Sequence, residues 1–128
     1  MNDIKDCNGK PYPVFSVGKV ISCASVDGAR PENSIFRLKI EMSENQKPLA
    51  GQFFMLRSVK SSHLLARPIS VFHIDCDKEK SKIQVSFLIL LKGEGTKELC
   101  NLEKNDEVQV LGPLGNNFIE FEQDTTIN

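Results

Sequence analysis

The 128-residue sequence lacks the features that mark membrane and secreted proteins. No stretch approaches the roughly 20 consecutive apolar residues of a membrane-spanning helix. The first ten residues contain four charged side chains and no continuous apolar core, so they do not form a secretory signal. We therefore expect a cytoplasmic protein without a membrane span.

A surplus of charge of one sign is also lacking. Sixteen basic side chains are set against seventeen acidic ones, which leaves a net charge of -1. This charge is too small to attract a polyanion along the whole surface, so we expect no nucleic-acid partner. The hydrophobic fraction of 40% and the charged fraction of 26% are typical of a globular protein, and the length fits one domain.

Metal-binding and nucleophile motifs are absent as well. The four cysteines include no C-x-x-C pair, which argues against a zinc site or a locally ligated cluster. Cys23, Cys76 and Cys100 stand in apolar contexts, where a reduced thiol packs as a small hydrophobe. His63 and His73 have no partners at metal-ligand spacing, and no G-x-S-x-G elbow is present. We expect no metal site and two ordinary histidines in a loop and a strand.

Six β-rich runs separated by turn-forming residues dominate the sequence. In the clearest run, from Phe36 to Met42, apolar residues alternate with Arg37, Lys39 and Glu41. This period of two predicts a half-buried strand with a charged outer face. The six expected strands span about 14–24, 36–42, 52–57, 68–74, 83–91 and 107–111.

The period changes near the end of the chain. Leu99 and Leu102 are three residues apart, which predicts a two-turn helix from Thr96 to Leu102 that is opened by Gly95 and Thr96. Short antiparallel strands with one late helix favour a closed or nearly closed barrel, because closure removes exposed strand edges. A β-sandwich is the alternative. The phenylalanines expected in the core rather than at a cofactor are Phe53, Phe54, Phe72, Phe87 and Phe118.

Two segments have residues suited to binding a phosphate-containing ligand. Arg67 to Ser70 opens a strand, and Lys92 to Thr96 joins a strand to the helix. The glycines of the second segment let backbone approach a ligand, and the first turn of a helix favours an anion. Arg67 supplies a planar cationic fork for phosphate, and Ser70 can donate to a heteroaromatic ring. Each residue also has an ordinary structural explanation, so only the combination of both segments indicates a ligand such as a pyrophosphate.

Three ordered motifs carry a resemblance to a known family. Arg67-Pro68-Ile69-Ser70, Gly95-Thr96-x-x-Leu99 and Leu111-Gly112-Pro113-Leu114-Gly115-Asn116 occur in the order and approximate spacing of the ferredoxin-reductase-like flavoproteins. The Pro-Ile-Ser and Gly-Pro-Leu-Gly-Asn forms resemble the dihydroorotate dehydrogenase electron-transfer subunits. The resemblance covers about Val14 to Phe118. It implies a six-stranded antiparallel Greek-key barrel with one short helix. This barrel would bind FAD.

The resemblance also implies a role for each matching residue. Arg67 would hold the pyrophosphate, and Gly95 with Thr96 would cap the phosphates from the helix. Ser70 would hydrogen-bond near the flavin N5 and is the predicted catalytic residue, while Leu88 to Leu90 would pass beside the isoalloxazine and ribose. The predicted cofactor-binding residues are Arg67, Pro68, Ile69, Ser70, Leu88, Ile89, Leu90, Gly95 and Thr96.

The expected organisation is a tail at 1–12, an FAD-binding barrel at 13–118 and a second tail at 119–128, where a nicotinamide-binding domain would normally follow. Thirteen residues follow Gly115, fewer than the roughly 30 of one βαβ unit. We therefore expect part of a flavin-dependent oxidoreductase that is incomplete for NAD(P)H oxidation alone. FAD would relay electrons between a nicotinamide cofactor and a dehydrogenase or iron-sulfur partner. The expected partners are a nicotinamide-binding domain or subunit and an electron-acceptor protein. The alternative is an FAD-free barrel that serves as a protein-interaction or scaffold module.

Overall fold

The computed structural model describes residues 13–26, 34–60, 66–77, 79 and 81–115. Cys7, His63, Phe118 and both predicted tails, 1–12 and 119–128, lie outside the described residues. The elements in chain order are β1 (Val14–Ser25), β2 (Ile35–Ser43), η2 (Glu44–Gln46), β3 (Phe53–Ser58), β4 (Arg67–Asp77), β5 (Lys82–Leu90), α1 (Gly93–Cys100) and β6 (Glu107–Leu114).

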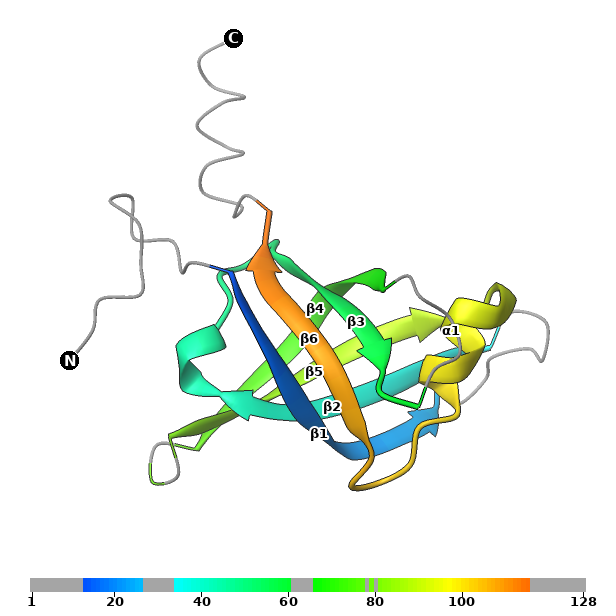
Figure 1. Ribbon diagram of the computed structural model, residues 1–128, viewed down its shortest axis with the longest axis horizontal. Coiled ribbons are helices and arrows are strands. Elements are labelled where there is room, and N and C mark those ends of the chain that lie inside the picture. Colours follow the sequence, from blue (N-terminus) through cyan, green and yellow to red (C-terminus); the bar gives the residue numbers. More distant parts are fainter. Residues whose placement is uncertain (1–12, 27–33, 61–65, 78, 80, 116–128) are drawn as a thin grey trace, which may run out of the picture.

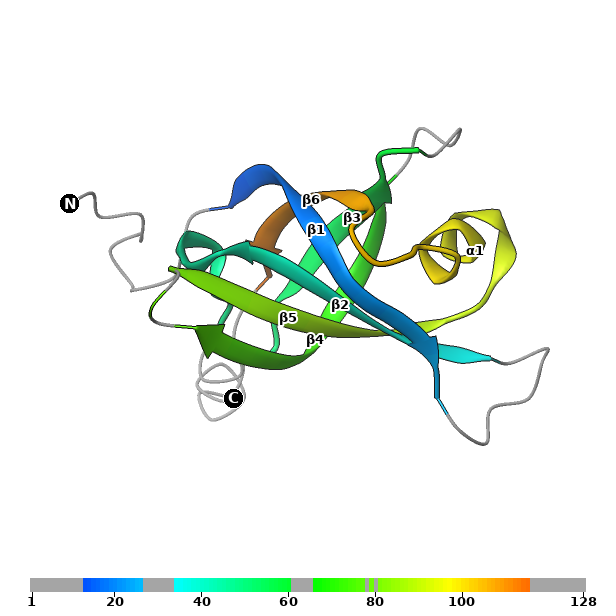
Figure 2. The same ribbon diagram turned by 90° about the horizontal axis from the view of Figure 1, so that it is seen from below.

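The six strands form a closed barrel in the order β1-β2-β5-β4-β3-β6 (Figures 1 and 2). Each neighbouring pair is antiparallel, and β6 returns to β1 to close the sheet. The predicted barrel with one short helix is therefore confirmed, and the sandwich alternative is wrong. Within the described residues, no helix is long and apolar enough to cross a membrane.

The core follows the alternation that the sequence shows. Leu38, Ile40 and Met42 of β2 point into the barrel, while Arg37 and Lys39 lie on its outer face. Phe54 and Phe87 meet edge to face at the centre, with ring centroids 5.8 Å apart and an interplanar angle of 88°, an arrangement that aromatic pairs favour. Both phenylalanines are fully buried, as predicted.

Two core predictions are wrong, and both concern β4. Phe72 is 55% exposed, because the register between β4 and β5 shifts between Val71 and His73, and its ring lies on the outer face beside Arg37. The Arg37 guanidinium carbon lies 5.5 Å from the Phe72 ring centroid, a cation–π contact that covers part of the ring. Cys76 is exposed, close to the end of the strand.

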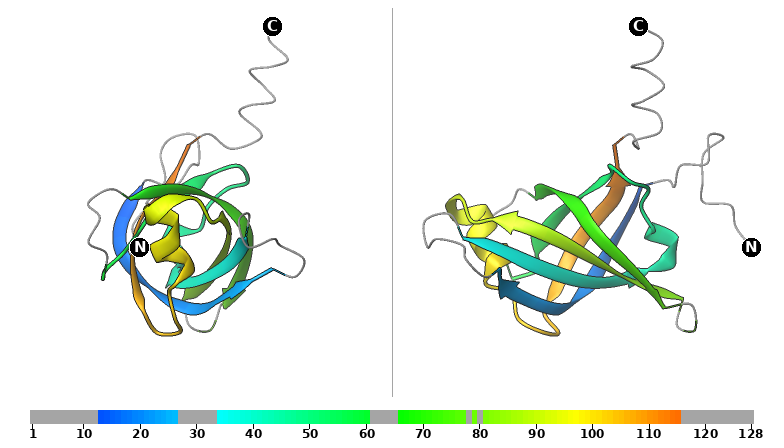
Figure 3. Two further views of the ribbon diagram at one scale, coloured as in Figure 1. Left: turned by 90° about the vertical axis from the view of Figure 1, so that its right-hand side faces the viewer. Right: turned by 180° about the vertical axis from the view of Figure 1, so that it is seen from behind.

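The two ends of the barrel are closed by different elements. Helix α1 lies across one end of the barrel (Figure 3). Its residues Leu99 and Cys100 are buried in the core. The helix begins at Gly93, three residues before the predicted start, and ends two residues before the predicted end. At the opposite end lies η2, whose Gln46 is fully buried.

Strand β6 is longer than predicted. It continues past Leu111 through Gly112 and Pro113, which are joined by a cis peptide bond, to Leu114. Val14 at the start of β1 pairs with Gly112. The described chain therefore enters and leaves the barrel side by side, at the end opposite α1 (Figure 1).

Candidate functional site

The pairing between β4 and β5 stops where the predicted site residues begin. The ladder runs from Asp77↔Lys82 to Val71↔Phe87 and ends there. Beyond it, Arg67 to Ser70 pair with β3 instead. Since β4 and β5 are antiparallel, the start of β4 and the end of β5 lie at the α1 end of the barrel. Unpaired strand edges there offer backbone N–H and C=O groups to a ligand.

The residues that border this β4–β5 opening are largely exposed. Arg67, Pro68 and Ser70 on β4 are exposed. Leu88 and Leu90 on β5 are 39% and 40% exposed, although leucine is usually buried. The structure thus brings two of the predicted segments, residues 67–70 and 88–90, to one opening. Both apolar and polar groups are exposed there.

The alternation of side chains along the strands limits how Ile89 and Ile69, two of the predicted cofactor-binding residues, can contact a ligand. The side chain of Ile89 is 1% exposed and lies in the barrel core, so only its backbone can reach a ligand outside the barrel. Ile69 is half-buried and packs against the core cluster. Leu88, Leu90 and Ser70 are the neighbours whose side chains are available.

The first turn of α1 provides the third segment, and there the Thr96 hydroxyl has hydrogen-bond partners in the backbone. Its hydroxyl oxygen accepts a hydrogen bond from the Lys92 backbone N–H over 2.6 Å and can donate to the carbonyl oxygens of Lys92 and Gly93. Thr96 therefore closes the start of the helix with its own hydroxyl. An anion at this turn would be met by unpaired backbone N–H groups. Gly93 has a φ of +67°, and the space that a β-carbon would occupy is open.

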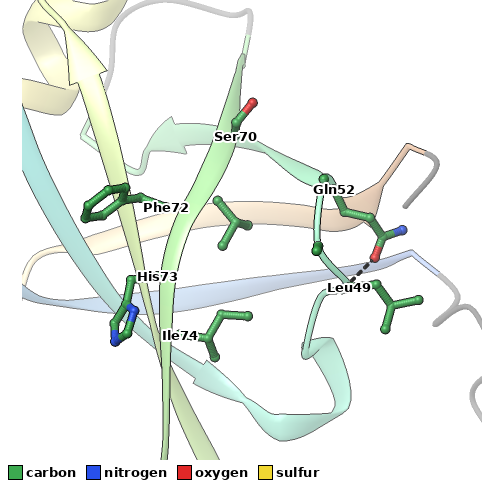
Figure 4. Close-up of a pocket in the computed structure, with 9 residues that line it drawn as sticks. Leu49, Gln52, Ser70, Phe72, His73 and Ile74 are labelled. Carbon is green, nitrogen blue, oxygen red and sulfur yellow. Dashed lines mark hydrogen bonds between the residues drawn. The ribbon is translucent and has the colours of Figure 1, made fainter. Parts of the chain in front are cut away.

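A pocket of about 550 Å³ adjoins Ser70 on the side away from α1 (Figure 4). It is lined by residues 49–52, which precede β3, and by residues 70–74 of β4. Its size falls within the range of about 300–1,000 Å³ that is usual for small-molecule sites. Most of its wall is apolar, and Ser70, Gln52 and His73 contribute the polar groups.

Gln52 fixes the loop that forms one wall of this pocket. Its side-chain oxygen accepts a hydrogen bond from the Leu49 N–H over 2.9 Å, and its side-chain nitrogen donates to the Gly115 carbonyl over 2.8 Å. The Val71 N–H donates to the Gln52 carbonyl over 3.3 Å, which ties the loop to β4. The sequence alone does not predict this loop. Its one signal was Gly51, which has a φ of +91° in the turn before β3.

Other polar groups near the site have partners of their own. His73 lies 3.1 Å from Asp75, which also forms an ion pair with Lys39 over 3.7 Å. The side chains of His73 and Asp75 are about half exposed, so the two pairs that they form add little stability. In the part of the chain that the structure describes, no three His, Cys, Asp or Glu side chains gather as a metal site.

The residues around the opening offer cationic, apolar and hydroxyl groups to a ligand. Arg67 and the start of α1 suit a pyrophosphate, Leu88 and Leu90 offer apolar contact, and the pocket beyond Ser70 has room for a ring. About 10 Å of strand separates Arg67 from Ser70, at roughly 3.3 Å per residue. This spacing suits a ligand whose anionic group and ring are joined by a short chain.

Sequence comparison relates the chain to electron transfer subunits of dihydroorotate dehydrogenase B. No protein-family model matches it. It is 38% identical over 92 residues to the electron transfer subunit of dihydroorotate dehydrogenase B (NAD(+)) from Clostridium acetobutylicum, covering 72% of this chain and 34% of that protein. The corresponding subunits of Listeria innocua and Streptococcus pneumoniae are 41% identical over 68 residues and 38% identical over 85 residues, covering 53% and 66% of this chain and 25% and 32% of those proteins. The resemblance inferred from the three motifs is thereby confirmed, and the chain spans about a third or less of the length of these relatives.

Structural comparison supports the fold. Ferredoxin-NADP+ reductase from Plasmodium falciparum superimposes with a TM-score of 0.53 at 20% identity, covering 80% of this chain and 40% of that enzyme. A structure of the same enzyme with 2'P-AMP gives a TM-score of 0.55 at 19% identity, covering 80% and 41%. The barrel is therefore of the ferredoxin-reductase type.

Proposed function

We propose that this chain, a relative of dihydroorotate dehydrogenase electron transfer subunits with a ferredoxin-reductase-type barrel, is the FAD-binding domain of an electron-transfer oxidoreductase. The observation that carries the proposal is the β4–β5 opening, which gathers Arg67, Ser70, Leu88 and Leu90 beside the start of α1. In the same proposal, residues 13–118 form the domain, and the flanking residues are tails or links to further domains.

Each part of the site has a distinct role in holding the cofactor. Arg67 neutralises and orients the pyrophosphate through its guanidinium, with help from backbone N–H groups of the first turn of α1. Leu88 and Leu90 pack against the apolar surface of the ligand. Ser70 and the pocket of residues 49–52 and 70–74 would hold the ring, and the largely apolar wall of that pocket would exclude water from it.

Ser70 is the residue that we place at the reacting atoms. Its exposed hydroxyl would donate a hydrogen bond near the flavin N5 and would thereby tune the electron affinity of the ring. FAD itself supplies the redox chemistry when it is bound, while the protein supplies position and electrostatics. A nicotinamide-binding domain or subunit would deliver electrons, and a dehydrogenase or iron-sulfur protein would receive them.

The direct test is titration with FAD and with FMN. We expect FAD to bind with the visible absorption of a protein-bound flavin, and FMN to bind at least tenfold more weakly because it lacks the pyrophosphate. At 100 times its dissociation constant, FAD should stabilise the domain by about 2.7 kcal/mol, which is measured as a rise in Tm. Equal affinity for the two flavins contradicts the pyrophosphate site. A colourless protein whose Tm ignores FAD would instead favour a barrel that serves as a scaffold module.

A further inference from the structure

An aromatic residue, Phe53, stands directly beside Ser70 on the outer wall of the barrel. In the antiparallel ladder between β3 and β4, Phe53 is the cross-strand partner of Ser70. The next pair, Phe54 with Ile69, belongs to the inner face, where Phe54 is fully buried. Because side chains alternate along a strand, Phe53 and Ser70 share the outer face. Side chains directly opposite each other on one face have β-carbons about 4.5–5.5 Å apart.

The Phe53 ring is held in place from the side of β6. Phe53 pairs with Leu114 at the end of that strand, and its ring lies against Gly115, where an added β-carbon would come within 3.0 Å of it. Gly115 has a φ of +88°, and its carbonyl accepts the hydrogen bond from Gln52. A larger residue at position 115 would displace the ring. The glycine therefore gives the ring a defined place between Ser70 and the end of β6.

The barrel core does not account for this phenylalanine. Phe53 is half-buried and lies outside the central core cluster. Residues 49–52, which line the pocket beside Ser70, lead directly into it. On the same face, the next pair toward Arg67 is Met55 with Pro68. An uncharged surface thus runs from the proposed pyrophosphate contact along the β3 side of Ser70 to Phe53.

We propose that Phe53 is a cofactor-contacting residue whose ring packs against the flavin ring at Ser70. This inference rests on the proposed function, because it requires the ring of FAD to lie at Ser70. Aromatic rings favour offset-stacked or edge-to-face contacts with centroids about 4.5–7 Å apart, a range that is open to cross-strand neighbours. Ser70 then supplies a hydroxyl, and Phe53 supplies the apolar surface, for the same ring.

The fluorescence of bound FAD tests this contact. A tyrosine close to an excited flavin quenches it by electron transfer, whereas a phenylalanine does not. Phe53→Tyr keeps the ring and adds one hydroxyl, so the emission of bound FAD should fall severalfold below that of the unmodified chain. Phe15→Tyr is the matched control and should leave the emission unchanged, because Phe15 is exposed on β1, two strands away from β3.

The affinity for FAD gives a second measure. Phe53→Ala removes the aromatic surface, so the Kd for FAD should rise about fivefold, as expected for the loss of one aromatic contact. Phe15→Ala should leave the Kd unchanged.

The emission decides between contact and packing. If Phe53→Tyr leaves the emission of bound FAD as high as Phe15→Tyr does, the proposal is overturned even when Phe53→Ala weakens binding, because lost packing against Gly115 explains such weakening. Bound FAD that Phe53→Tyr fails to quench thus overturns the contact alone. An unmodified chain that binds no FAD overturns the proposed function and the contact together.

Discussion

Gln52 donates its side-chain amide to the carbonyl oxygen of Gly115 over 2.8 Å, from a position that is only 2% exposed. A second buried glutamine acts in parallel: Gln46 donates to the carbonyl oxygens of Val14 and Gly112 over 3.0 and 3.3 Å and accepts from the Ser16 hydroxyl over 2.6 Å. Both residues belong to the connection between β2 and β3. This connection therefore holds one carbonyl within β6, that of Gly112, and one just after the strand, that of Gly115.

The two glutamines differ in one respect, which gives a controlled experiment. Gln52 lines the pocket beside Ser70, whereas Gln46 does not. We expect Gln52→Ala and Gln46→Ala each to lower the free energy of unfolding by about 1–3 kcal/mol, because each leaves buried polar groups without partners. Only Gln52→Ala should also weaken FAD binding. If both substitutions change the affinity for FAD equally, the pocket is not part of the cofactor site.

The predicted pyrophosphate contact can be tested at Arg67. Arg67→Ala removes a charge-assisted hydrogen bond worth about 1.5–3 kcal/mol, so the Kd for FAD measured by fluorescence titration should rise at least tenfold. Arg57→Ala is the matched control, because Arg57 donates to Gln109 on the wall formed by β3 and β6. An Arg67→Ala protein that fails to fold would show that this arginine is structural.

Ser70 should affect the electronic properties of the flavin more than its affinity. Ser70→Ala removes the hydroxyl expected near N5, so the visible spectrum and the reduction potential should change while the Kd for FAD changes little. Ser22→Ala, an exposed serine on β1, provides the control. If the potential of the Ser70→Ala protein equals that of the unmodified protein, Ser70 has no part in the redox role.

The cysteines should react at very different rates. Burial, and then the nearby Cys23, raise the pKa of Cys100 to about 11, and burial also raises the pKa of Cys23. In a Cys7→Ser background, an alkylating reagent at mildly alkaline pH should therefore label the exposed Cys76 first. Labelling of Cys100 at the same rate as Cys76 would contradict the packed position of α1.

The same shift predicts how stability depends on pH. The unfolded chain loses the Cys100 proton near the ordinary thiol pKa of about 8.5, while the folded chain keeps it until about pH 11. The free energy of unfolding should therefore fall as pH rises through this window. Denaturant melts at several pH values measure it, and Cys100→Ala should flatten the part of the slope that this thiol causes.

Most of the fold could be predicted from the sequence because alternation along a strand reports which face is buried. Strands β2 and β5 were placed to within a residue or two on this basis, and the change of period at Leu99 located the helix. The exposure of Phe72 could not be predicted, because a one-residue register shift between β4 and β5 reverses the expected face. The extension of β6 past Leu111 could not be predicted either, because Gly112 and Pro113 are residues that normally end a strand.

The site was predictable in part. Arg67, Ser70, Leu88 and Leu90 meet at one opening, as the motifs indicate. The contact between the Thr96 hydroxyl and the Lys92 backbone could not be predicted, because it depends on where the helix starts. The role of Thr96 at the phosphates stays a prediction. The Leu49 to Gln52 loop was missed because its role comes from hydrogen bonds to residues far along the chain, which no local pattern reveals.

The pairing of Val14 with Gly112 has a consequence for how this barrel can be combined with other polypeptides. A domain whose first and last strands are neighbours can be inserted into another protein, or fused at either end, with little strain on its host. The Gly115 carbonyl accepts a hydrogen bond from Gln52, which lines the pocket. Any polypeptide joined at Gly115 therefore starts beside the pocket. Such a polypeptide would lie on the pocket side of the barrel, at the end opposite α1.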